Sequence, residues 1–221
     1  MAPGTLVLTR APAFSAALGY ASQRWAEVGG LLVVPSREAA ADALREAAGG
    51  GVAIGREAVT FAALRGRVAA ALGVAEPEVP SRVVTRLALR EVLDRVDLSA
   101  FGASARAPGF LTGVERAVGE LRVAAVPPER VRAVASDARS TALAEIHAAA
   151  WSGVAHPSDA LWSVAAAADD LDAFPAVTVA GFDDLVPGQW ALLRALARVA
   201  PVEVVIEAGT AQSSRLRSPS R

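Results

Sequence analysis

The sequence predicts an α/β fold in which a parallel sheet is interrupted by an all-helical insertion. Three observations support this prediction. Short apolar, β-branched runs alternate with helical patterns over residues 1–73, the strand signal disappears from Ala75 to about Asp172, and the alternation then returns. Because strands resume after the insertion, we expect both ends of the chain to build one sheet.

The first two expected strands and the helix between them follow directly from local patterns. Thr5–Thr9 is a β-branched, apolar run and predicts a strand, and a helix is expected over Phe14–Trp25, ending at Gly29 and Gly30. The continuous apolar run Leu31–Val34 is typical of a strand buried on both faces of a sheet.

The next elements begin at a capping residue. Ser36 is an expected N-cap for a helix over Arg37–Ala48. Extended segments are expected at Val52–Ile54 and Glu57–Thr60, on either side of a glycine. An amphipathic helix over Phe61–Leu72 follows.

The insertion contains no strand pattern, and prolines lie at or near the expected helix starts. After it, Ala176–Ala180 and Val202–Ile206 predict strands on either side of a helix over Gln189–Val199. The polar tail Thr210–Arg221 is expected to be disordered. The helices expected in the insertion are Ser81–Val96, Pro108–Val123, Pro128–Trp151 and Ser158–Leu171.

Composition excludes several chemistries. The formal net charge is −1, so any DNA contact must come from a local cluster rather than from the field of the whole molecule. The absence of cysteine excludes disulfides, thiolate catalysis and Cys–metal sites, and all 22 basic residues are arginine. No apolar run approaches the ~18 residues of a membrane span. A cytoplasmic protein is therefore expected.

The first strand–turn–helix unit is compared with the phosphate-binding loop of ATPases, GxxxxGK[ST]. The corresponding turn, from Thr9 through Arg10 to Ser15, lacks both the loop glycines and the lysine, and Pro12 removes one N–H donor. The helix start could still attract an anion. We expect a degenerate phosphate loop that does not support ATP hydrolysis.

The segment 177–189 is compared with the strand that ends in Asp-Glu at ATPase magnesium sites. Ala180 and Gly181 occupy those two positions, and Asp183 and Asp184 follow in the loop. These two carboxylates are either a displaced metal pair or, as we prefer, caps for the next turn or helix.

A third candidate site lies where the extended segment 57–60 enters its helix. Thr60, Arg65 and Arg67 offer hydroxyl and guanidinium contacts to phosphate, and Phe61 offers a ring for base stacking or, more simply, for the core. No pattern around His147 or His156 indicates a metal site, and no GxSxG elbow is present. No catalytic residue is assigned.

Four segments, taken together, resemble the N-terminal, helicase-like region of the AddB-type ATP-dependent helicase–nucleases. Their order and spacing carry the resemblance more than any one motif. The segments are Val33–Ala39, Glu57–Gly73, Pro108–Glu120 and Val177–Gln189.

The resemblance implies a superfamily-1 helicase architecture on a P-loop NTPase, RecA-like sheet. Residues 1–74 with 173–209 would form helicase domain 1A, and residues 75–172 would form its helical 1B-type insertion. The family's ATP, magnesium and iron–sulfur cluster belong to parts that are degenerate or absent here, and the missing cysteines exclude the cluster. The chain is therefore expected to be a fragment or a frameshifted product.

The resemblance also implies partners and a role. The expected function is a non-hydrolytic DNA-channel and scaffold domain in double-strand-break repair, which contacts single-stranded or broken-end DNA beside the A-type motor subunit. Two alternatives stay open. One is a module that only docks a partner helicase, and the other is a nucleotide-binding enzyme with an atypical loop.

Overall fold

The computed structural model describes residues 5–11, 13–49, 54–75, 78 and 80–207. The expected disordered tail Thr210–Arg221 lies outside the described residues. The same holds for residues 52 and 53 of the expected extended segment, whose last residue, Ile54, lies in a turn.

The chain divides into two compact units. The first comprises Met1–Val74, Ala168–Leu185 and Leu193–Arg221, and the second comprises Ala75–Ala167 and Val186–Leu192. The first boundary falls between Val74 and Ala75. The chain returns to the first unit at residue 168 instead of 173, and the start of the following helix groups with the helical unit.

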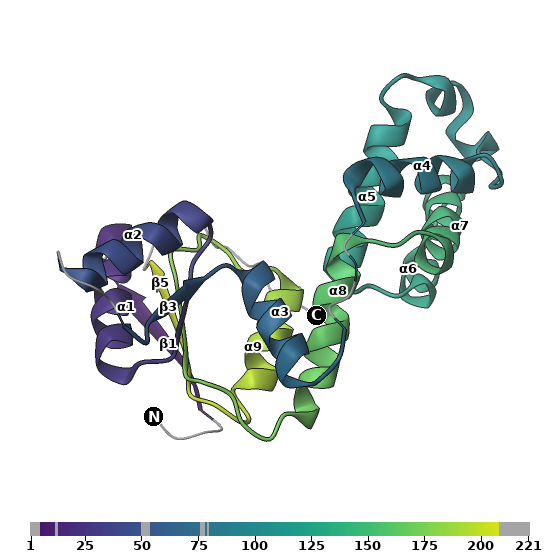
Figure 1. Cartoon of the computed structure of the whole chain (residues 1–221). Coiled ribbons are helices and arrows are strands. Elements are labelled where there is room, and N and C mark those ends of the chain that lie inside the picture. Colours follow the sequence, from purple (N-terminus) through teal and green to yellow (C-terminus); the bar gives the residue numbers. More distant parts are fainter. Residues whose placement is uncertain (1–4, 12, 50–53, 76–77, 79, 208–221) are drawn as a thin grey trace, which may run out of the picture. The chain divides into compact units, whose positions relative to one another are not determined.

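The first unit is built on one parallel five-stranded sheet, as the alternating pattern predicts (Figure 1). The strand order is β1-β5-β4-β2-β3, so the opening and closing strands of the chain pair directly, with Leu6 opposite Val202. An α/β fold with a parallel sheet is therefore confirmed. The strands are β1 (Leu6–Ala11), β2 (Leu31–Val33), β3 (Glu57–Val59), β4 (Val177–Ala180) and β5 (Val202–Glu207).

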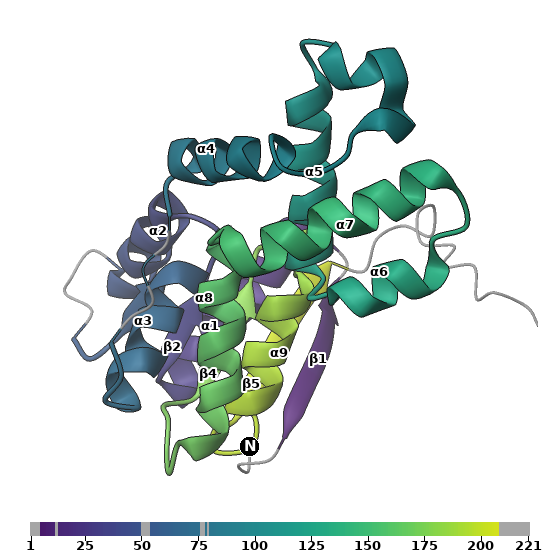
Figure 2. The ribbon, with the colours of Figure 1, turned by 90° about the vertical axis from the view of Figure 1, so that its right-hand side faces the viewer.

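Burial along the strands reflects their positions in the sheet. All four residues of β4 and all three of β2 are buried, which for β2 agrees with its continuous apolar run. β1 lies at an edge of the sheet (Figure 2), and its Leu6 and Leu8 are exposed on the face that also carries Val202 and Val204. The central strands are thus fully buried, whereas exposed and half-buried residues alternate along β1 from Leu6 to Arg10.

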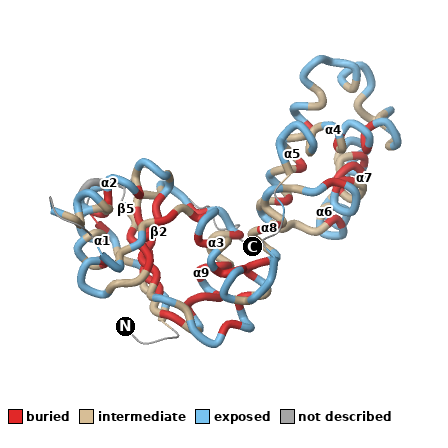
Figure 3. Tube along the Cα trace, viewed as in Figure 1, coloured by how far each residue is buried: buried red, intermediate tan, exposed pale blue. Residues whose placement is uncertain are grey.

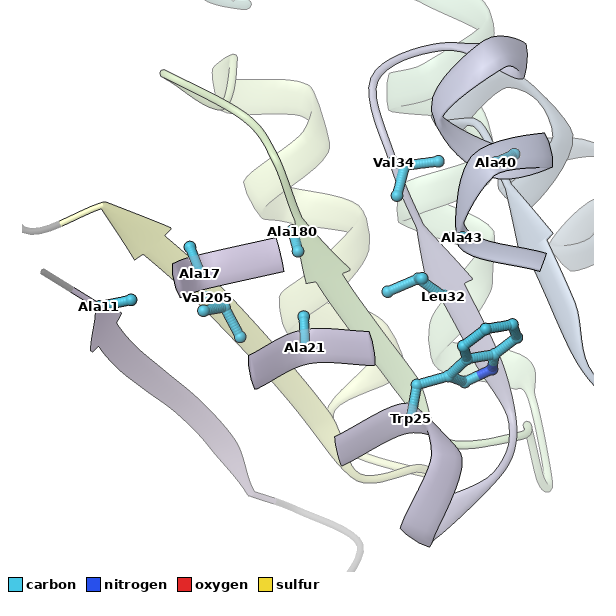
Figure 4. Packing of buried hydrophobic residues seen from close by; sticks show 10 residues of the cluster. All are labelled: Ala11, Ala17, Ala21, Trp25, Leu32, Val34, Ala40, Ala43, Ala180 and Val205. Atoms are coloured by element: carbon cyan, nitrogen blue, oxygen red, sulfur yellow. The ribbon is translucent and has the colours of Figure 1, made fainter. Parts of the chain in front are cut away.

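Helices α1 (Phe14–Val28) and α2 (Arg37–Ala48) cover one face of the sheet, and α3 (Phe61–Ala71) lies on the other (Figure 1). Between the sheet and the first two helices, Trp25 lies beside Leu32 in a cluster made mostly of alanine and valine (Figure 4). Small side chains let helix and sheet approach closely. The Trp25 indole donates to the Gly30 carbonyl at 3.1 Å and so has a partner inside this core.

Glycine is required where β2 begins. Gly30 has φ +85°, and a Cβ there would overlap the carbonyl group of Ala176, the residue before β4. The same carbonyl accepts the Leu31 N–H at 2.8 Å. A glycine predicted only to end a helix therefore also lets two neighbouring strands start in register.

The second unit is all-helical, as expected, but the sequence misplaces one boundary. The predicted helix Pro128–Trp151 is two helices, because Asp137 starts a new one with a capping box in which its side chain accepts the Ser140 N–H at 2.8 Å. A 3₁₀ segment was also missed. The helices are α4 (Arg82–Leu93), η1 (Ser99–Arg106), α5 (Phe110–Val123), α6 (Pro128–Val134), α7 (Ala138–Gly153) and α8 (Pro157–Ala167).

The helical unit has its own core. Leu89 of α4, Val114 and Val118 of α5, and Ile146 and Ala150 of α7 form its buried centre, seen as the red stretches of these helices in Figure 3. Their spacings of four residues place each pair on one helix face. In the described residues of both units, no helix has the length and apolar character needed to cross a membrane.

Candidate functional site

The parallel sheet brings part of each of the three sequence-predicted sites to one side. In a parallel sheet all carboxyl ends lie on the same side, and α/β proteins bind ligands just outside them. Arg10 lies near the end of β1, Gly181 follows β4 and Thr60 follows β3. With strands about 4.8 Å apart, each outer site is roughly 10 Å from the central one. We call this side of the sheet the carboxyl edge.

The β1–α1 junction has few groups that could hold a phosphate. Arg10 is exposed, and Ala13, the N-cap residue of α1, makes no side-chain capping bond. Ser15 lies in α1. Thr9 points its hydroxyl toward β5 and donates to Glu203 at 2.6 Å, so this hydroxyl has a structural partner.

Glu203 is the polar residue that sequence reasoning missed in this region. It is 4% exposed and accepts bonds from Thr9, from the Tyr20 hydroxyl at 3.1 Å and from Arg24 Nε at 3.3 Å. A carboxylate within an otherwise apolar strand was the available signal. Three donors from β1 and α1 satisfy the charge, so the cluster ties the edge strand to its neighbours.

The loop after β4 contains no carboxylate at the strand end. Ala180 is fully buried, and Gly181 has φ +81°. A Cβ at Gly181 would lie 3.1 Å from Leu18 and 3.2 Å from Pro35, so the position is crowded as well as left-handed. The glutamate that this register would place at Gly181 would not fit there without a shift of its neighbours.

The two aspartates further along this loop are exposed. Asp184 accepts the N–H of Leu185 at 2.8 Å. The start of α9 (Pro187–Leu196) is satisfied by another residue, because Gln189 accepts the Val186 N–H at 2.9 Å. Asp184 thus orders the loop, and Asp183 projects from it.

At the β3–α3 junction, Thr60 and Phe61 have clear structural roles. Thr60 is the N-cap of α3 and accepts the Ala63 N–H at 3.4 Å. Phe61 is 8% exposed and packs edge-to-face on Phe182, with ring centroids 5.2 Å apart. Its ring therefore belongs to the core, the simpler of the two interpretations.

The two arginines of α3 lie away from the carboxyl edge. Arg67 pairs with Glu57, the first residue of β3, at 2.7 Å, because the helix runs back along its strand. Six helical residues correspond to about 9 Å of axial rise from Phe61. Arg65 is half-buried. The structure therefore does not bring Thr60 and Arg67 together.

Two residues of the carboxyl edge were not predicted as site residues. Ser36, correctly predicted as a cap, accepts the Ala39 N–H at 3.1 Å and follows β2, and Arg37 is exposed beside it. The start of α2 already stabilises a negative charge. A hydrogen bond to the backbone N–H of Glu38, then one to Ser36, and then the charge of Arg37 lower the pKa of the Glu38 carboxyl group. The Pro-Ser turn after an apolar strand was the signal.

The carboxyl edge thus offers guanidinium, hydroxyl and backbone N–H groups, which suit oxyanions. Across the described parts of both units, no cluster of three His, Cys, Asp or Glu side chains could hold a metal ion. His147 is buried in the helical unit, with Nε2 2.8 Å from the Val126 carbonyl oxygen.

Fold and site define an α/β protein that carries an anion-compatible sheet edge and a separate helical unit. No family model and no curated protein matches this chain.

Proposed function

We propose that the chain is a non-hydrolytic, helicase-like domain that holds single-stranded or broken-end DNA along the carboxyl edge. The observation that carries the proposal is the strand order, in which β5 and β4 follow β1 and bring the phosphate-loop and magnesium-loop equivalents to one edge. This arrangement suits the RecA-like sheet that the sequence resemblance implies. At both positions the groups that ATP chemistry requires are replaced.

DNA contact at this edge would be electrostatic and independent of sequence. Arg10 and Arg37 are exposed, and β1 and β2 are three strand positions apart, about 14 Å. This separation exceeds the distance between adjacent phosphates of a single strand, so the two guanidinium groups would contact phosphates about two nucleotides apart. Thr60 adds a hydroxyl one strand further along. Arg67 contributes less, because Glu57 neutralises it.

The experiment is fluorescence anisotropy of a labelled oligothymidylate titrated with the 221-residue chain at several salt concentrations. Arg10→Ala and Arg37→Ala are each expected to weaken binding severalfold and to reduce the slope of log affinity against log salt by about 0.7. The matched control is Arg45→Ala, an exposed arginine paired with Asp42 near the opposite end of α2. Absence of binding at low salt, or equal losses in all three variants, refutes the edge as a DNA surface.

A second candidate function, docking of an A-type motor subunit, is favoured by α4. Val83, Val84 and Leu87 are 67%, 56% and 59% exposed. Three exposed apolar side chains on one short helix form a patch typical of protein contacts. If the chain docks through this patch, Leu87→Glu abolishes binding to the purified motor subunit in calorimetry and leaves DNA binding intact. Unchanged docking by this variant would rule the patch out.

A further inference from the structure

The helical unit contains a cavity that none of the functions above uses. Its volume is about 520 Å³, within the range of roughly 300–1,000 Å³ that small-molecule sites occupy. α4, α5 and the segment that enters α8 line it. Leu89, Val118 and Val154 supply apolar walls, and Gly119, Arg122 and His156 also line the cavity.

Arg122 is a buried cation with an unused donor. It is 5% exposed and donates from Nη1 to the Ala150 carbonyl at 2.6 Å and from Nη2 to Asp159 at 2.7 Å. The guanidinium also lies over the Trp151 ring, 5.3 Å from its centroid. Nε is buried too, yet no residue in the described part of the chain accepts its hydrogen. Buried N–H groups of native proteins nearly always have a partner.

His156, which also lines the cavity, offers a hydrogen-bond donor to it. The Ser158 backbone N–H donates to its Nδ1 at 3.2 Å, so Nδ1 is an acceptor and the neutral ring carries its hydrogen on Nε2. Burial, and then the charge of Arg122, lower the pKa of His156, which favours this neutral form. No hydrogen bond among the described residues engages Nε2. Gly119 is adjacent, since a Cβ there would lie 3.5 Å from Nε2.

The carboxylate of the cavity wall does not oppose an anion. Glu115 is held by Arg82 at 3.0 Å and Arg86 at 3.3 Å, so two guanidinium groups offset its charge. Arg116 also lines the cavity, with its side chain largely exposed. The balance of charge around the opening is positive.

We propose that this cavity binds a small ligand with one oxyanion group on an apolar body, in the class of aromatic or aliphatic carboxylates and phosphate monoesters. The oxyanion accepts from His156 Nε2 beside the positive charge of Arg122, which also lines the cavity, and the apolar body lies against Leu89, Val118 and Val154. The cavity lies within the helical unit, so the proposal is independent of DNA binding at the carboxyl edge.

Isothermal titration calorimetry of the full chain tests the proposal with four probes. Benzoate and phenyl phosphate carry both features, benzyl alcohol lacks the oxyanion, and inorganic phosphate lacks the apolar body. Saturable binding of benzoate or phenyl phosphate, at least tenfold tighter than that of the other two, is the expected result. The stronger of the two binders identifies the natural oxyanion as carboxylate or phosphate.

Gly119→Ala and Gly113→Ala are the matched variants. Both residues lie in α5, where alanine favours the helix, so both variants should fold. A methyl at Gly119 covers His156 Nε2, whereas nothing lies within 4 Å of a Cβ at Gly113. We expect at least a tenfold loss of affinity in the first variant and none in the second. Equal affinity in both variants, equal binding of benzyl alcohol and benzoate, or no saturable binding overturns the proposal.

Discussion

Thr9 on β1 donates a hydrogen bond to Glu203 on β5 over 2.6 Å, and this bond joins the first strand of the chain to the last. Glu203 is nearly inaccessible to solvent and depends on protein donors to replace lost hydration. The residue that aligns with the start of a phosphate loop therefore serves the sheet. Because the Thr9 hydroxyl donates to Glu203, its hydrogen is not available to the phosphate of a nucleotide.

Removing the Thr9 hydroxyl should destabilise the edge of the sheet. Thr9→Val keeps the shape of the side chain and leaves Glu203 with two donors, so we expect a loss of about 1.5 kcal/mol in urea denaturation. Tyr20→Phe removes a longer, only partly buried hydrogen bond of 3.1 Å, so it should lower the free energy of unfolding by less. If the order of the two losses is reversed, Thr9 is not the principal partner of Glu203.

Gly181 is expected to tolerate alanine less well than another left-handed glycine. Gly55 also has a left-handed backbone, with φ +71°, but no atom lies within 4 Å of a Cβ built there. Gly55→Ala should therefore cost about 1 kcal/mol of stability from backbone strain alone. Gly181→Ala adds contacts of 3.1 and 3.2 Å and should cost a further 1–3 kcal/mol, about the penalty of overpacking. Chemical denaturation of both variants measures the difference, and equal costs would show that the neighbours move aside freely.

Magnesium ATP should neither stabilise the chain nor be hydrolysed by it. A ligand that binds the folded state raises the thermal midpoint, so a scan with and without magnesium ATP detects binding at the atypical loop. We expect no shift and no phosphate release. A shift that is lost in Arg10→Ala or Ser15→Ala would instead support the nucleotide-binding alternative.

His156 should make the stability of the chain sensitive to mild acid. The pKa of His156 is lowered in the folded state. Below pH 6.5, the ordinary pKa of histidine, the unfolded chain therefore binds a proton at His156 more readily than the folded chain does. The contribution of neutral His156 to the free energy of unfolding is fully present above pH 6.5. It is lost as the pH falls from there through the lowered pKa of the folded state. Arg122 opposes protonation and Asp159 favours it. His156→Gln should show a smaller drop in thermal midpoint between about pH 7.5 and pH 5 than the unmodified chain, and equal drops would contradict the prediction.

The elements of the first unit could be predicted because each has a strong local signal. The buried strand Leu31–Val33 is a continuous apolar run, Val177–Ala180 is a β-branched and apolar run, and Ser36 is the cap that its position suggests. The helical unit was harder. Asp137 interrupts a long helical pattern, and whether an aspartate caps a new helix or sits on the surface of one depends on the chain around it.

The candidate sites divide in the same way. That the turn after the first strand lacks glycine and lysine is a property of residue types and is visible in the sequence. That Phe61 packs on Phe182, that Arg67 pairs with Glu57, or that Arg37 joins the carboxyl edge could not be predicted, because each depends on how helices fold back across strands. The cavity beside Arg122 and His156 was also out of reach, since its walls come from segments tens of residues apart.

By itself, the sequence determined the alternation of strands and helices, the parallel sheet and the absence of lysine and of loop glycines after the first strand, because these follow from hydrophobic periodicity and from which side chains exist. Tertiary structure alone decided which polar groups are buried together, such as Glu203 with Thr9 and Arg122 with Asp159. Burying a charge requires partners in three dimensions, and no local pattern along the chain encodes where those partners will be.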